Sequence, residues 1–261
     1  MTDDGLCLQA IAGMLYNTIL GAWPIQADGT SFYYSDYATT GRKVWYGQKW
    51  PCCSGTFPQL AADYHISTYL RSADGVYVNL FTPSKVKWTD GAATCALTQE
   101  TGYPFDGKVT IKVSASSPVE TTLFVRIPAW ATPAPVLSVN GARVTSGVEP
   151  GTFAAIRRTW KDGDRIEMEM PMPLRLERVD LQHPNQQALL RGPLVLFAIT
   201  DAQPPFEAAA LLRATPAGPS GDCTATAADG KNIVMRPFMA PNTVSDTRPT
   251  ISIGGGGGPG R

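Results

Sequence analysis

The sequence lacks both a net charge and a long apolar run, and each absence narrows the range of functions. Lys and Arg together number 22, as do Asp and Glu, and no basic run is interleaved with aromatic residues. The chain therefore has no net positive charge that would attract a polyanion such as a nucleic acid. No apolar stretch reaches the roughly 20 residues that a membrane-spanning helix needs. Neutral partners, sugars included, fit this composition better, and it leaves the cellular compartment open.

Cysteine and histidine are also scarce. The five cysteines are odd in number and irregularly spaced, and there are only two histidines. This pattern does not form a disulfide framework, so reduced thiols or a metal site are the better interpretation. The first ten residues have neither the basic start nor the apolar stretch of a signal peptide. The hydrophobic residues, 43% of the chain, are enough to bury a substantial core in one large or two ordinary domains.

Two helices are predicted in the first part of the chain. Apolar residues between Leu8 and Leu20 recur at spacings of three and four, which favours a helix of about three turns. A second helix is expected to begin near Thr56, because Thr56 and Gln59 match the capping-box pattern and Pro58 falls in the first turn. Two helices cannot bury their own apolar faces, so we expect a further helical region upstream.

From residue 74 onward the period of the apolar residues changes to two. Turn signals at Asn140-Gly141 and Asp162-Gly163 separate short segments, as in all-β proteins. This spacing favours a sandwich or a jelly roll. Order is expected to weaken after residue 199, where Ala, Pro, Gly and Thr dominate, and Gly254 to Gly258 predict a flexible tail. The clearest alternating or apolar segments are 76–81, 108–113, 123–127, 166–170 and 194–199.

The most informative feature is the vicinal pair Cys52-Cys53, immediately before the predicted start of the second helix. Unpaired backbone N–H groups and the helix dipole at such a position favour a thiolate. The pair can therefore bind zinc or supply a nucleophile. Two packed thiols and a strained vicinal disulfide are the alternatives. Zinc needs four ligands, or three and an open position, and two sulfurs do not complete such a site.

Histidines and carboxylates offer few partners for this pair. His65 could face it from the helix, although a lone helical histidine is more often a packed or surface residue. A Cys–His protease using His65 or His183 would lack the known local signatures and an orienting Asn or Asp. Asp36 and Glu100 are candidate acid/base carboxylates, but no pair at the separation of glycosidases is evident. We interpret the remaining cysteines, Cys7, Cys95 and Cys223, as structural.

An aromatic region between Trp23 and Trp50 has two interpretations as well. Its rings could stack on sugars, or they could pack where a helical domain meets a β domain. Considered alone, ordinary packing is the better interpretation.

Ten short segments together resemble glycoside hydrolase family 127, the β-L-arabinofuranosidase family, in the family's order. They cover most of the chain up to about residue 240, and the ordered series is more specific than any one motif. The segments are YNTIL (16–20), DGTSFYY (28–34), WPCCSG (50–55), VNLF (78–81), LTQET (97–101), RIPAW (126–130), VNG (139–141), WKDGD (160–164), RGPLV (191–195) and RPF (236–238).

The resemblance implies the last helices of an (α/α)6 barrel followed by an all-β, jelly-roll-like sandwich region. We accordingly predict the C-terminal part of a barrel domain in residues 1–72, a β-sandwich domain in 73–175, a smaller β region in 176–245 and a flexible tail in 246–261.

By the same resemblance, Cys52 is the expected nucleophile of a retaining glycosidase, and Cys52 and Cys53 are expected to bind Zn²⁺. The family's third cysteine, its zinc-binding glutamate and its acid/base glutamate precede this stretch, so we expect an incomplete site and little activity from these 261 residues. Ser54-Gly55-Thr56 replaces the family's frequent Pro-Pro-Asn, which leaves the sugar open. The expected partner is an L-arabinofuranoside or a related sugar. A non-catalytic carbohydrate-binding or accessory β-sandwich is the alternative.

Overall fold

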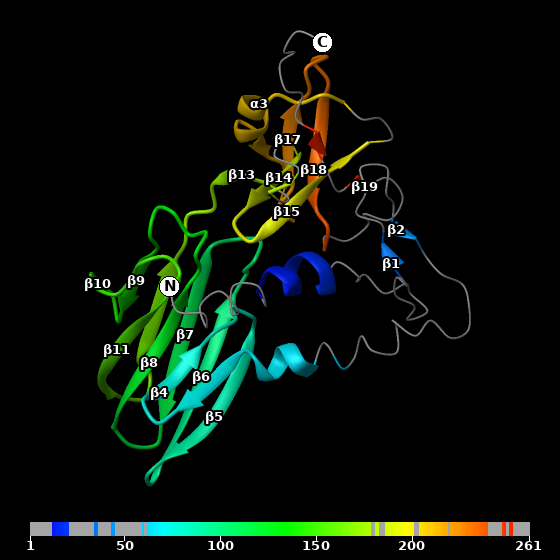
Figure 1. Cartoon of the computed structure of the whole chain (residues 1–261). Helices are drawn as coiled ribbons and strands as arrows, with labels where there is room; N and C mark the ends of the chain where they lie inside the picture. Colours follow the sequence, from blue (N-terminus) through cyan, green and yellow to red (C-terminus); the bar gives the residue numbers. More distant parts are fainter. Residues whose placement is uncertain are drawn as a thin grey trace. The chain divides into compact units, whose positions relative to one another are not determined.

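The described part of the chain is dominated by β-strands arranged in two compact units (Figure 1). In this computed structural model the described residues are 12–20, 34–35, 43–44, 59, 62–178, 181–182, 186–200, 204–218, 220–239, 247–248 and 251–252. The first unit comprises Met1–Ala12 and Ala61–Met172, and the second comprises Gly13–Leu60 and Pro173–Arg261. Within the described ranges, no helix is long and apolar enough to cross a membrane.

The first unit contains a six-stranded sheet in the order β10-β9-β12-β7-β6-β5 and a four-stranded sheet in the order β11-β8-β4-β3. Neighbouring strands are antiparallel except β4 and β8, which pair in parallel. The strands are β3 (Tyr69–Ser72), β4 (Gly75–Val78), β5 (Ser84–Asp90), β6 (Ala93–Thr101), β7 (Lys108–Ala115), β8 (Val119–Ile127), β9 (Val136–Val139), β10 (Ala142–Val144), β11 (Thr152–Trp160) and β12 (Arg165–Glu169).

Alternating side chains build the core of this unit. Val109, Ile111 and Val113 of β7 are at most 2% exposed, whereas the residues between them are partly exposed. The same alternation buries Leu123 and Val125 of β8. Strands with one apolar and one polar face bury the apolar face against a second layer. The β-rich architecture expected from the period of two is therefore confirmed, and it fits a β-sandwich.

Both turn signals in this part of the sequence lie in turns between strands. Asn140 (φ 51°) and Gly141 (φ 80°) join β9 to β10. Two consecutive positive φ values are what a two-residue hairpin turn requires, and Asn followed by Gly tolerates them best. Gly163 (φ 85°) lies between β11 and β12.

The second unit contains an eight-stranded sheet with the path β13-β14-β15-β18-β17-β16, in which β19 pairs with β15 and β20 with β14. A separate two-stranded sheet joins β1 and β2, and η1 is a π-helical segment. The elements are η1 (Leu15–Ile19), β1 (Tyr34–Ser35), β2 (Lys43–Val44), β13 (Leu174–Arg178), β14 (Gln186–Arg191), β15 (Leu194–Ile199), α3 (Ala208–Leu212), β16 (Thr215–Pro216), β17 (Cys223–Thr226), β18 (Asn232–Pro237), β19 (Thr247–Arg248) and β20 (Ile251–Ser252).

The prediction that order weakens after residue 199 is wrong for residues 204–218 and 220–239. This stretch forms α3 and β16 to β18, and its side chains join a common core with β14 and β15. Phe206 and Leu211 are at most 2% exposed, and the small residues Ala225 and Ala227 are buried beside them. The composition is poor in large apolar residues, but a few of them, packed against small ones, are sufficient to bury this sheet.

The predicted helices are described only in part. Residues 62–66 are helical, in agreement with the second helix, whereas its expected start at Thr56 lies outside the described residues. Most of residues 1–72 are outside them too, so the barrel helices and the four domain boundaries stay predictions. The tail residues Gly254 to Gly258 are likewise outside.

Candidate functional site

The predicted nucleophile and zinc ligands, Cys52 and Cys53, lie outside the described residues, as do Cys7, Asp36 and His183. In the part of the chain that the structure describes, no group of three or more His, Cys, Asp or Glu side chains could hold a metal ion. The role of the cysteine pair therefore stays a prediction from the sequence.

His65 and Glu100 are described, and both lie on the surface. His65 is exposed on the 62–66 helix, where its carbonyl oxygen accepts a hydrogen bond from the N–H of Thr68 at 3.2 Å. Glu100 lies on β6 and forms an ion pair with Lys112 at 2.5 Å, both side chains being about half exposed (55% and 42%).

The described cysteines are packed thiols. Cys95 on β6 and Cys223 on β17 are each 1% exposed, and neither is in a disulfide. Burial raises the pKa of both thiols above the usual range. A raised pKa keeps a thiol protonated and unreactive, in agreement with the structural role expected for these residues.

Three of the segments that carry the family resemblance meet in the first unit around the backbone of VNLF (78–81). The guanidinium Nε of Arg126, from RIPAW, donates a hydrogen bond to the carbonyl oxygen of Asn79, and the guanidinium lies 5.7 Å from the ring centroid of Phe81. The side-chain Nε2 of Gln99, from LTQET, donates to the carbonyl oxygen of Leu80 at 3.0 Å. These polar side chains are at most 4% exposed. Gln99 and Arg126 were not predicted to be functional residues from the sequence. A polar residue within an apolar strand pattern is a signal that could have identified them.

Two other such segments meet in the second unit. The side-chain amide of Asn17, from YNTIL, donates from Nδ2 to the carbonyl oxygen of Pro193 at 2.8 Å. Its Oδ1 accepts a hydrogen bond from the N–H of Val195 at 2.7 Å. Asn17 thus holds the start of β15 from both sides, so the RGPLV segment is bound to the helical segment by one amide group.

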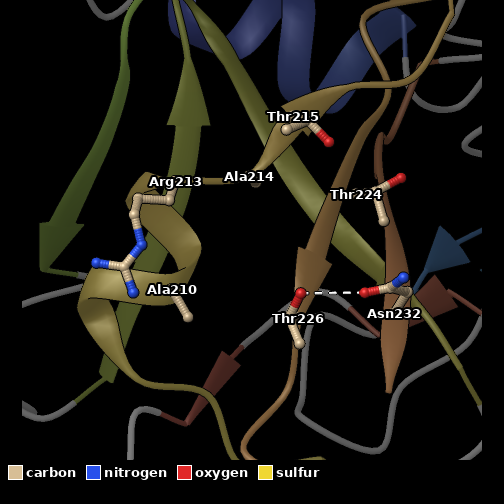
Figure 2. Close-up of a pocket in the computed structure, with 7 residues that line it drawn as sticks. All are labelled: Ala210, Arg213, Ala214, Thr215, Thr224, Thr226 and Asn232. Carbon is tan, nitrogen blue, oxygen red and sulfur yellow. Dashed lines mark hydrogen bonds between the residues drawn. The ribbon is translucent and has the colours of Figure 1, made fainter. Parts of the chain in front are cut away.

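A shallow pocket of about 320 Å³ lies in the second unit between α3 and the strands β16 to β18 (Figure 2). The hydroxyl group of Thr226 donates to Oδ1 of Asn232 at 3.0 Å, and Figure 2 shows the guanidinium of Arg213 on the α3 side, turned away from these two residues. No carboxylate, histidine or thiol is among the lining residues, so the pocket offers hydrogen bonds but no nucleophile or general acid. The lining consists of Ala210, Arg213, Ala214, Thr215, Thr224, Thr226 and Asn232.

The fold and these contacts define the described part as two β-rich units that hold family-like segments in place. Residues 75–172 match the profile "Beta-L-arabinofuranosidase, GH127 middle domain". The resemblance to glycoside hydrolase family 127 that the ordered segments indicated is therefore confirmed.

Proteins similar to this chain are named as β-arabinofuranosidases. A non-reducing end β-L-arabinofuranosidase of Bifidobacterium longum is 26% identical over 197 residues, which are 67% of this chain and 29% of the relative. A GH127 β-L-arabinofuranosidase from Geobacillus stearothermophilus T6 has a TM-score of 0.75 and 22% identity, covering 97% of this chain and 47% of that one. A further GH127 β-arabinofuranosidase has a TM-score of 0.72 and 24% identity, covering 96% and 46%. The solved structures show a shared fold, and the chain spans less than half of their length.

Proposed function

We propose that this chain is the C-terminal portion of a retaining glycoside hydrolase that acts on L-arabinofuranosides or related sugars. The observation that carries the proposal is the match of residues 75–172 to the GH127 middle domain. The name of the curated relative, a β-L-arabinofuranosidase, supports the substrate class. In this proposal residues 1–72 supply the last helices of an (α/α)6 barrel, and the two β units follow it.

The cysteine pair supplies the chemistry in this proposal, with Cys52 as nucleophile and Cys53 as a metal ligand. Thiolates are among the ligands that zinc prefers, so the donor type of Cys52 and Cys53 fits Zn²⁺, although two donors fall short of the three or four that a site needs. A bound zinc ion would keep the sulfurs deprotonated.

The reaction proceeds in two displacements. The Sγ of Cys52 attacks the anomeric carbon, a C–S bond forms as the glycosidic C–O bond breaks, and a carboxylic acid protonates the leaving oxygen. The resulting carboxylate then takes a proton from water, whose oxygen displaces the sulfur and regenerates the thiolate. Two inversions give net retention, with sulfur in place of the usual carboxylate nucleophile.

Hydrolysis of an aryl β-L-arabinofuranoside tests this proposal. We expect little or no release of the aryl group by the 261-residue chain, because two thiolates bind zinc more weakly than a complete site does. The full-length parent should be active, and Cys52→Ala in the parent should abolish activity, whereas substitution of the packed Cys95 by Ala should leave it largely unchanged. Hydrolysis by the 261-residue chain that disappears in Cys52→Ala would contradict the expected inactivity. A parent that keeps full activity in Cys52→Ala would refute the cysteine nucleophile.

A non-catalytic carbohydrate-binding role is the second candidate. The pocket in Figure 2 favours it, because its hydroxyl, amide and guanidinium groups can bind sugar hydroxyls without any group that could break a glycosidic bond. Binding of an arabinan oligosaccharide that survives replacement of both Cys52 and Cys53 by Ser, measured by calorimetry, would support this candidate. Loss of binding in that double variant would argue against it.

A further inference from the structure

The turn between β9 and β10 contains the only Asn-Gly dipeptide of the sequence, Asn140-Gly141. An Asn followed by Gly is especially prone to spontaneous deamidation, because glycine has no side chain to hinder the attack of its backbone nitrogen on the preceding side-chain amide. Both residues are exposed, so water reaches the turn. By residue type and exposure alone, the turn is therefore a site for this reaction.

Deamidation breaks the bond between Cγ and Nδ2 of Asn140. The backbone nitrogen of Gly141 attacks Cγ, a bond between this nitrogen and Cγ forms, and Nδ2 leaves as ammonia with the proton that the backbone nitrogen gives up. Water then opens the resulting succinimide ring at either of its carbonyl groups. Position 140 becomes aspartate or isoaspartate, and the reaction needs no co-reactant other than water.

The backbone conformation of the turn opposes ring closure. The ring can close only if Cβ of Asn140 and the nitrogen of Gly141 lie on the same side of the bond between Cα and the carbonyl carbon. Asn140 has a φ of 51°, in the left-handed region, where ψ is about +30 to +60°. Such a ψ places Cβ and the next nitrogen on opposite sides of this bond. The turn has to open before the ring can form.

Three hydrogen bonds at the start of β12 hold Asn140 in this unreactive conformation. Its Nδ2 donates to Oδ1 of Asp164 at 2.8 Å, and its Oδ1 accepts a hydrogen bond from the N–H of Arg165, also at 2.8 Å. The backbone N–H of Asn140 donates to the carbonyl oxygen of Arg165 at 2.9 Å. The bond to Asp164 has a charged acceptor, which makes it one of the stronger kind.

We propose that Asn140-Gly141 is a latent deamidation site that Asp164 keeps closed in the folded chain. Aspartate at position 140 places a second carboxylate against Asp164, and like charges at this distance repel. Isoaspartate lengthens the backbone of a two-residue turn by one carbon atom. Both products lack the amide donor, so a single deamidation removes the hydrogen bond that had prevented it. This inference concerns the durability of the β unit and does not depend on the function proposed above.

The experiment incubates the whole 261-residue chain at one fixed pH, well below its unfolding temperature, and measures aspartate and isoaspartate at position 140 by peptide mapping with mass spectrometry. A synthetic peptide of residues 137–143 gives the rate without the fold. Asp164→Ala removes the acceptor, and Asp164→Asn, which keeps the shape of the side chain, covers the case in which Asp164→Ala does not fold. Gly107→Ala is the matched control, because its Cβ would overlap the carbonyl of Met170 in the same unit and leave Asp164 in place.

We expect the folded chain to deamidate at least about tenfold more slowly than the peptide, and Asp164→Ala to react roughly tenfold faster than the native chain. Asp164→Asn should lie between the native chain and Asp164→Ala, and Gly107→Ala should react at the native rate. A folded chain that reacts as fast as the peptide, or native rates in both Asp164 variants, would overturn the proposal. Equal acceleration in Gly107→Ala would overturn it too, because the protection would then come from the stability of the whole unit and not from Asp164.

Discussion

Asp164 joins two turns of the first unit, and its replacement by Asn should destabilise this unit measurably. Its Oδ1 accepts a hydrogen bond from the side-chain amide of Asn140 at 2.8 Å, and its Oδ2 accepts one from the N–H of Lys161 at 2.9 Å. The guanidinium of Arg158 lies 3.7 Å away, and the Asp164 side chain is only 12% exposed. The carboxylate therefore links the β9–β10 turn to the β11–β12 turn.

The expected magnitude follows from these contacts. Asn in place of Asp keeps one acceptor oxygen but turns an N–H group toward a neighbouring donor and removes the charge. Hydrogen bonds to charged groups contribute about 1.5–3 kcal/mol each, so a loss of roughly 2 kcal/mol is expected for Asp164→Asn. For a domain of about 100 residues, this corresponds to a Tm lower by roughly 8–16 °C.

The effect should also depend on pH. Burial acts to raise the pKa of Asp164, but the hydrogen bonds from Lys161 and Asn140 and the charge of Arg158 outweigh it, and the pKa is lowered overall. A carboxyl whose pKa is lower in the folded state contributes stability above its unfolded value of about 3.9, and this stability is lost as the pH falls through the folded value. The Tm difference between the native chain and Asp164→Asn should therefore be full at pH 7 and shrink below about pH 4.

Thermal unfolding of both chains by circular dichroism at several pH values measures this difference. Asp162→Asn is the control, because Asp162 is exposed in the same turn and accepts one long hydrogen bond, from the N–H of Ala115 at 3.3 Å. Its replacement should change the free energy of unfolding by no more than about 0.5 kcal/mol. Equal Tm shifts in the two variants, or a difference that persists unchanged at pH 2, would refute the reasoning.

Two further predictions concern packing. Gly107→Ala should destabilise the chain by about 1–3 kcal/mol in chemical denaturation, because a Cβ there would overlap the backbone carbonyl of Met170. Gly91 is the control, because a Cβ there meets nothing within 4 Å. Gly91→Ala should cost only the strain of a positive φ. A smaller loss of stability in Gly107→Ala than in Gly91→Ala would contradict the close approach at Gly107. Cys95 and Cys223, which are buried, should not be alkylated by iodoacetamide in the folded chain at pH 7 but should be alkylated after unfolding. Alkylation of either cysteine in the folded chain, detected by mass spectrometry, would contradict this prediction.

Local pattern was sufficient to predict much of the β architecture. The alternating segments 108–113 and 166–170 lie in β7 and β12, and the apolar segment 194–199 is β15. Such predictions succeed because a strand with one buried face has a period of two that the sequence records directly. The Asn140-Gly141 turn was predictable for a similar reason, since its two positive φ values depend on the residues themselves.

The order of strands was not predictable in this way. The parallel pairing of β4 with β8 joins residues that are 47 positions apart, as in Val76 with Leu123. The family resemblance implied a β region in 176–245, but the composition after residue 199 did not indicate order, because the stability of these strands comes from packing against β14 and β15. Tertiary packing overrides weak local signals in such segments.

The sequence by itself determined the cysteine pair, its place before a predicted helix start and the ordered segments that indicate the family, because these depend only on residue identity and spacing. Only the tertiary structure decided that Asn79, Gln99 and Arg126 meet at one buried point. Each lies in a different part of the chain, and a buried hydrogen bond between distant segments leaves no periodic trace in the sequence. Their roles could be read only after the two sheets had brought these residues together.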